Sequence, residues 1–132
     1  MKRLATLMAG AALALGATAA TAADPAEKGE ARLAKMLEGR VAGEPVRCIT
    51  TFRSNQPQII PRVALVHDEG ETIYVSRPAN PRSLDSFDIL VIDRFSPSQL
   101  CVEDRMRTID RSSGMLTGIV FLEEFVPYTK AG

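Results

Sequence analysis

The first periodic run of apolar residues has the spacing of a helix. Leu33, Met36 and Leu37 fall on one stripe of segment 25–38, and charged side chains occupy many of the other positions. This pattern predicts one amphipathic helix over residues 25–38, packed on the part of the chain that follows.

The residues around this segment supply the signals that begin and end a helix. Asp24 suits the N-cap, Pro25 suits the first helical position, and Glu27 lies three residues after the cap. Gly39 suits the left-handed position that ends a helix, whereas Gly29 predicts fraying of the first turns.

From residue 45 the pattern changes to short runs rich in β-branched residues, which indicates strands. The clearest local signal is a hairpin, because two such runs flank a turn that contains Gly70. The run 89–92 is continuously apolar and predicts a strand covered on both faces. The predicted strands are 46–52, 63–67, 72–76, 89–92, 101–109 and 117–122.

Together these elements predict an α+β fold that is mainly β. We expect an N-terminal helix on a small antiparallel β domain of about six strands, barrel-like or sandwich-like. The closing segment 125–128 is expected to pack its two aromatic side chains onto this domain. A chain of 132 residues has room for one domain, which we expect to span residues 24–132.

Residues 1–23 differ from the rest of the chain. Lys2 and Arg3 precede a stretch made mostly of Ala and Leu, and small residues follow it. This arrangement is typical of a secretory signal peptide. Small side chains at Thr21 and Ala23 favour cleavage after Ala23, and cleavage after Ala22 is also compatible with the sequence.

An uncleaved membrane anchor is the alternative interpretation of this segment. Its many Ala, Gly and Thr residues make a poor membrane span, and it has no Cys that a lipid anchor would need. It also lacks a twin-arginine pair, so we expect export by the general secretory route to the periplasm, without a stable membrane anchor after processing.

The charge and the cysteine content argue against several classes of function. The chain has 16 basic and 16 acidic residues, and this neutrality argues against a nucleic-acid binder. Cys48 and Cys101 are the only cysteines, and in an oxidising compartment they most simply form one structural disulfide. Their spacing does not suit a Cys-x-x-Cys redox pair, and a metal site would need further soft ligands.

Four short segments carry a resemblance over residues 31–128. They are Arg47-Cys48-Ile49, Tyr74-Val75-Ser76-Arg77-Pro78, Ser98-Gln99-Leu100-Cys101 and Phe125-Val126-Pro127-Tyr128. The chain resembles a group of small exported bacterial proteins of unknown function. The resemblance implies export and a single compact domain, and it implies no catalytic residue.

The sequence offers little for catalysis, and we expect no enzyme. His67 is the only histidine. It would need Asp68 or Asp93 and one of Ser83, Ser86 or Ser113, without any Gly-x-Ser-x-Gly motif to position a nucleophile. A lone histidine at a strand end is more often an exposed or hydrogen-bonded surface residue.

The sequence also offers little that would bind a metal or a cofactor. Segment 67–71 is rich in carboxylates but lacks the spacing of a calcium loop, so we interpret it as a solvated turn. Glu123-Glu124 or Asp85 with Asp88 would be weak candidates for glycoside hydrolysis, because the chain has no Trp to form a sugar platform. We expect no metal site and no haem, flavin or nucleotide cofactor.

Arginine provides the remaining candidate site. Arg105 and Arg107 alternate along a predicted strand and would share a face, and Arg77 and Arg82 bracket a proline-rich loop. Such a group can bind carboxylate, phosphate or an acidic partner. The alternative is a self-paired surface, since Glu103, Asp104 and Asp110 are close in sequence.

These observations favour a non-catalytic periplasmic module that binds an envelope or periplasmic protein. One alternative is a binder of a small anionic ligand held by Arg77 or Arg107. Another is an inhibitor of an exported hydrolase that presents loop 77–83.

Overall fold

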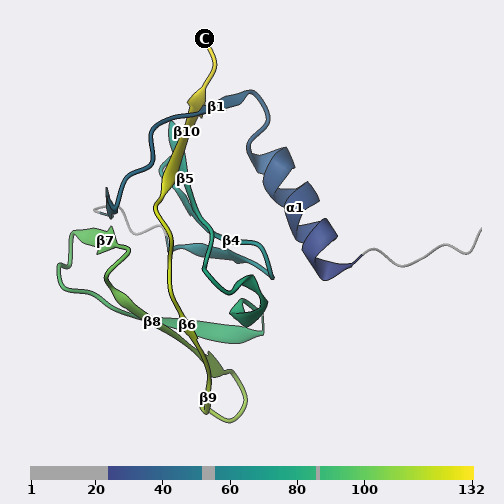
Figure 1. Ribbon diagram of the computed structural model, residues 1–132, viewed down its shortest axis with the longest axis vertical. Coiled ribbons are helices and arrows are strands. Elements are labelled where there is room, and N and C mark those ends of the chain that lie inside the picture. The colour runs from purple at the N-terminus through teal and green to yellow at the C-terminus, as the bar shows by residue number, and fades with distance from the viewer. Residues whose placement is uncertain (1–23, 52–55, 86) are drawn as a thin grey trace, which may run out of the picture.

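The computed structural model describes residues 24–51, 56–85 and 87–132. The predicted signal peptide, residues 1–23, lies outside the described residues. In the described part of the chain, no helix is long and apolar enough to cross a membrane. The elements are α1 (Pro25–Met36), β1 (Arg40–Ala42), β2 (Cys48–Thr50), β3 (Gln58–Ile60), β4 (Ala64–Asp68), β5 (Thr72–Ser76), the 3-10 helix η1 (Pro81–Ser83), β6 (Asp88–Asp93), β7 (Gln99–Cys101), β8 (Arg105–Asp110), β9 (Leu116–Val120) and β10 (Val126–Lys130) (Figure 1).

The predicted class, α+β and mainly β, is confirmed. Among the described residues every strand pairing is antiparallel. The strands form a five-stranded sheet (β1-β10-β5-β4-β3), a three-stranded sheet (β6-β8-β9) and a two-stranded sheet (β2-β7). The described residues form ten short strands where we expected about six.

Two of the additional strands have a clear origin: a predicted strand is divided by a turn, and the closing segment forms a strand of its own. The predicted strand 101–109 is interrupted by a turn in which the Asp104 amide donates to the Cys101 carbonyl at 3.1 Å. The closing segment is itself a strand, β10, which lies between β1 and β5 despite the proline at position 127.

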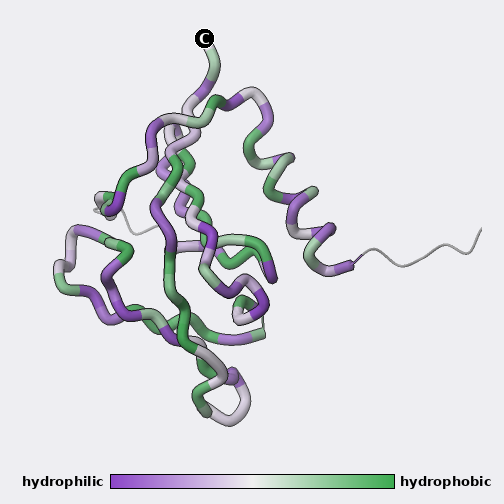
Figure 2. The backbone as a smooth tube through the Cα atoms, viewed as in Figure 1, coloured by the Kyte–Doolittle hydropathy of each residue, from purple (hydrophilic) through white to green (hydrophobic). Residues whose placement is uncertain are grey.

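Helix α1 begins as predicted and ends earlier. The Asp24 carboxylate accepts from the Ala26 amide at 3.2 Å, and Pro25 is the first helical residue. The helix ends at Met36, two residues before the predicted end at 38, and Gly39 follows with a φ of 72°. Hydrophilic and hydrophobic residues alternate along its turns (Figure 2).

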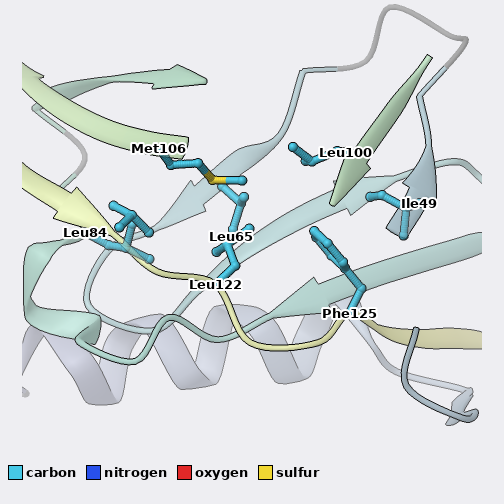
Figure 3. Packing of buried hydrophobic residues seen from close by; sticks show 8 residues of the cluster. Ile49, Leu65, Leu84, Leu100, Met106, Leu122 and Phe125 are labelled. Atoms are coloured by element: carbon cyan, nitrogen blue, oxygen red, sulfur yellow. The ribbon is translucent and has the colours of Figure 1, made fainter. Parts of the chain in front are cut away.

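Two apolar clusters lie on opposite faces of the five-stranded sheet. Leu65 and Val66 are consecutive on β4 and belong to different clusters, because neighbouring strand residues point to opposite faces. The first cluster, seen from close by in Figure 3, contains Ile49, Leu65, Leu84, Leu100, Met106, Val120, Leu122 and Phe125. The second contains Leu33 of α1 with Ile60, Val63, Ala64, Val66, Ile73 and Val75.

The predicted disulfide is present. Cys48 of β2 lies directly opposite Cys101 of β7, and the two residues form a disulfide. This bond joins the two strands of the smallest sheet, each of which has only three residues.

Candidate interaction surface

The three-stranded sheet has one buried face and one exposed face. Along β8, Met106 and Thr108 are buried, whereas Arg105 and Arg107 are exposed. This alternation follows from the pleat of the strand, which sends successive side chains to opposite faces. Arg105 and Arg107 therefore share the exposed face.

The pairing register shows which neighbours surround these arginines. Asp93 of β6 pairs with Arg105, and Arg107 lies between Val91 of β6 and Ile119 of β9. We define the outer face as Ile89, Val91, Asp93, Arg105, Arg107, Ile109, Leu116, Ile119 and Phe121.

Apolar side chains on the outer face are unusually exposed. Ile119 is 57% exposed and Phe121 is 68% exposed. An open hollow of about 810 Å³ lies over this face and is lined by both arginines and by Phe121. Exposed apolar groups gathered on one face of a small domain are typical of a binding surface.

The turn between β8 and β9 holds the two strands in register. The Asp110 carboxylate accepts from the Ser112 amide at 2.9 Å and from the Ser113 amide at 2.7 Å. These hydrogen bonds with Ser113 and Ser112 lower the pKa of Asp110 below its ordinary value. Gly114 completes the turn with a φ of 71°, which a residue with a Cβ adopts less readily.

The three acidic residues that are close in sequence to Arg105 and Arg107 have other partners. Glu103 pairs with Arg47 of the β1–β2 connection. Asp104 is buried and accepts from the Phe95 and Cys101 amides at 3.1 and 2.8 Å. Asp110 accepts within its own turn. In the part of the chain that the structure describes, these three acids therefore form no ion pair with Arg105 or Arg107.

The charge of the outer face is only partly balanced. Arg107 lies 3.9 Å from an Asp93 carboxylate oxygen, and both side chains are more than half exposed. A contact of this length and exposure contributes little stability. Within the described residues, Arg105 has no ion pair. The face therefore combines apolar surface with available positive charge.

The other two candidate arginines lie elsewhere. Arg77 donates to both carboxylate oxygens of Glu30 on α1, at 2.6 and 3.2 Å. The hydrogen bond from Arg77 lowers the pKa of Glu30, although partial burial acts in the opposite direction. Arg82 is exposed in η1. Only Arg105 and Arg107 belong to the outer face.

Loop 77–83 is attached to the chain that follows β9. The Ala79 amide donates to the Phe121 carbonyl at 2.9 Å, and Pro78 forms a bridge with Leu122. The Glu123 amide donates to the Arg77 carbonyl at 3.1 Å. This loop therefore lies along an edge of the three-stranded sheet.

His67 is buried, which corrects the expectation of a surface histidine. It is 1% exposed, because β4 is covered on both faces. Its Nε2 lies 2.5 Å from a Glu69 carboxylate oxygen, and its Nδ1 has no hydrogen-bond partner among the described residues. Ser86 lies outside the described residues. Three other candidate partners form no hydrogen bond with His67 in the described part: Asp93, Ser83 and Ser113.

The sequence did not indicate the apolar part of the outer face. Ile89 is 41% exposed, so the expectation that strand 89–92 is covered on both faces is wrong. The available sequence signal was that apolar residues occupy successive positions in 89–92 and in 119–122. The one buried face of an antiparallel sheet requires an apolar residue only at every second position.

A comparison of the chain with protein-family models, curated proteins and solved structures finds no match. The resemblance to small exported bacterial proteins therefore stays a prediction. Any function has to be argued from the surface of the molecule itself.

Proposed function

We propose that this protein is a non-catalytic periplasmic interaction module, stabilised by one disulfide, that binds an envelope or periplasmic protein through the outer face. The observation that supports this proposal is the grouping of exposed apolar side chains around Arg105 and Arg107. A surface of this composition resembles the centre of a protein interface, where apolar residues and arginines are enriched.

The positive charge of Arg105 and Arg107 indicates which chemical groups the partner would carry. Arg105 has no ion pair among the described residues, and Arg107 has only the long contact with Asp93. A carboxylate on the partner would form a charge-assisted hydrogen bond with either guanidinium. We therefore propose a partner segment that combines apolar side chains with Asp or Glu.

We also propose that α1 is packed on the β domain as a fixed part of the module. Leu33 is 3% exposed within a cluster that includes Ile60 and Val66 of the five-stranded sheet. The ion pair between Glu30 and Arg77 joins the helix to the residue that follows β5. Both contacts lie away from the outer face, which leaves that face free for a partner.

The test is a crosslinked pull-down of the processed protein from its own periplasm, at low and at high salt. We expect Ile119→Asp to reduce capture of a reproducible partner at least about tenfold, because a carboxylate replaces an apolar contact beside Arg107. Val41→Asp is the matched control, since Val41 on β1 is 56% exposed and lies outside the outer face.

The outcomes separate clearly. Loss of the partner in Ile119→Asp, with retention in Val41→Asp, supports the proposal, and weaker capture at high salt indicates that the arginines contribute. Equal capture by the two variants would show that the outer face is not the binding surface.

A second candidate function is binding of a small amphiphile with an anionic headgroup. The hollow of about 810 Å³ contains both apolar side chains and the two arginines, which suits such a ligand. Calorimetric titration with a medium-chain fatty acid tests this candidate. Binding that is lost in Arg105→Gln/Arg107→Gln would support it, and no heat at millimolar ligand would exclude that class.

A further inference from the structure

Strand β6 leaves an edge of the three-stranded sheet unpaired. It pairs with β8 on one side, and within the described residues no strand pairs with its other side. With six residues, Asp88–Asp93, it is the longest edge strand in the described part of the chain. Its free side presents backbone N–H and C=O groups that another strand can use.

The other edges are short or covered. Loop 77–83 lies against the residue that follows β9, through the Ala79 amide and the Phe121 carbonyl. The edge strands β1 and β3 have three residues each, and Pro57 and Pro61 flank β3. Short strands and prolines are common ways to prevent pairing at an edge.

Strand β6 lacks these protections. Its sequence is Asp-Ile-Leu-Val-Ile-Asp, with no Lys or Pro inside the strand. Leu90 and Ile92 point to the core side of the sheet, yet they are only partly buried. A neighbouring strand on the free side would cover them further, and this burial of apolar surface would favour pairing at the edge.

We propose that two copies of this chain pair through β6, antiparallel and around a two-fold axis at Val91. Two sheets join with matching faces only if residues on the same face lie opposite each other. The register centred on Val91 meets this condition. It also places Leu90 opposite Ile92 of the second copy, so that apolar side chains meet on the core side.

Charge complementarity selects this register over its neighbours. Centred on Val91, the pairing places Asp88 of each copy opposite Arg94 of the other. Among the described residues of its own chain, the Asp88 carboxylate accepts only from the Thr117 hydroxyl, and the Arg94 guanidinium donates only to the Thr51 hydroxyl. Neither charge has an ion pair there. An axis at Leu90 would instead place Asp88 opposite Ile92, and an axis at Ile92 would place Arg94 opposite Leu90.

This pairing would join two three-stranded sheets into one continuous sheet and place two outer faces side by side. The inference does not depend on the proposed function, because it uses the edge of the sheet rather than its exposed face. Isologous pairing of this kind is the commonest form of homodimer symmetry.

The first measurement is sedimentation equilibrium of the purified protein over a range of concentrations. We expect a reversible dimer, and a monomer at every concentration would overturn the proposal. Val91→Cys then tests the register. The two introduced thiols would lie directly opposite each other, and oxidation is expected to give a covalent dimer.

Ile89→Cys is the matched control on the same strand and the same face. Its two thiols would be about 13 Å apart in this register, too far for a disulfide. Crosslinking of Val91→Cys but not of Ile89→Cys supports the register. The reverse result, or no crosslink in either variant, would overturn it.

A charge at the axis provides an independent test. Val91→Lys would place two ammonium groups opposite each other, and we expect it to weaken the dimer at least about tenfold. Val41→Lys puts the same charge on β1, an exposed position outside the outer face, and is expected to leave the dimer intact. A dimer that resists Val91→Lys would show that another surface pairs. If Val91→Lys fails to fold by circular dichroism, the crosslinking result decides.

Discussion

Arg77 and Glu30 are 47 residues apart in the sequence, and their contact limits what Arg77 can bind. Both charged side chains are about half exposed, and the guanidinium donates to both carboxylate oxygens. The pairing raises the pKa of Arg77 above its ordinary value and lowers that of Glu30. An anionic ligand at Arg77 would have to compete with this carboxylate, which is why Arg105 and Arg107 are the better candidates.

The pair makes a prediction about pH. Arg77→Gln should raise the pKa of Glu30 toward its ordinary value, because the hydrogen bond and the positive charge are both lost. Since the folded-state pKa is lowered, the stabilising effect of the pair is present above the unfolded pKa of the carboxyl and is lost as pH falls through the folded value. NMR titration of the Glu30 carboxyl measures this shift.

Arg82→Gln is the control, because Arg82 is exposed and has no ion pair among the described residues. It should leave the Glu30 titration unchanged. An unchanged pKa in Arg77→Gln would show that the contact with Glu30 is not populated in solution.

At the scale of elements, helix α1 depends on Gly29 in a way that its sequence does not suggest. Helix propensity alone predicts a weak first turn at this residue. In the structure Gly29 is buried, and a Cβ placed there would lie 2.5 Å from Val63 Cγ2 and 2.9 Å from the Pro61 carbonyl oxygen. The missing side chain allows the helix to approach the chain between β3 and β4.

In Gly29→Ala these two effects change the free energy of unfolding in opposite directions, so the sign of the measured change shows which effect is larger. Helix propensity favours Ala by about 1 kcal/mol, whereas overpacking costs about 1–3 kcal/mol. We expect overpacking to outweigh propensity, so that the free energy of unfolding falls by up to about 2 kcal/mol, as measured by urea denaturation.

Ala34→Gly separates the two effects, because Ala34 is exposed on the same helix. It should cost about 1 kcal/mol by propensity alone. If Gly29→Ala proves more stable than the original chain, then α1 does not approach Val63 as closely as described.

At the scale of the whole molecule, the disulfide closes a long segment of chain. Cys48 and Cys101 are 53 residues apart, and the segment between them includes β3, β4, β5 and β6. Ile49 and Leu100, which follow and precede these cysteines, belong to the same buried cluster. The bond therefore joins the two strands through which Ile49 and Leu100 enter this cluster.

Replacing both cysteines tests this role. Cys48→Ser/Cys101→Ser should lower the free energy of unfolding by about 2–4 kcal/mol, because the unfolded chain regains the entropy of the open loop. Urea denaturation measures the loss. A reducing agent should destabilise the original protein and leave the double variant unchanged. A double variant as stable as the original would show that the disulfide does not constrain the fold.

Much of the architecture follows from local pattern. The helix start at Asp24 and Pro25 is confirmed, because capping acts within a few residues. The 63–76 hairpin is confirmed as β4 and β5, because its turn and alternation are also local. Strands β1, β3, β7 and β10 were not predicted. The first three have only three residues each, which give too little periodicity to recognise, and β10 contains Pro127, which argues against a strand inside a sheet.

The candidate site was only partly visible in the sequence. The alternation of Arg105 and Arg107 indicated a shared face, because a strand has a period of two. Which residues surround them depended on the pairing of β8 with β6 and β9, which no local rule fixes. The partners of Glu103 and Asp104 were decided in the same way, by contacts that form only when distant segments meet.

The sequence by itself determined the mainly β class, the helix start, the central hairpin and the pairing of the only two cysteines, because composition and short-range geometry govern each of them. The tertiary structure alone decided the burial of His67, the ion pair of Arg77, the exposure of Ile119 and Phe121, and the free edge of β6. These features depend on which surfaces the sheets cover when they pack, and packing is a property of the whole chain.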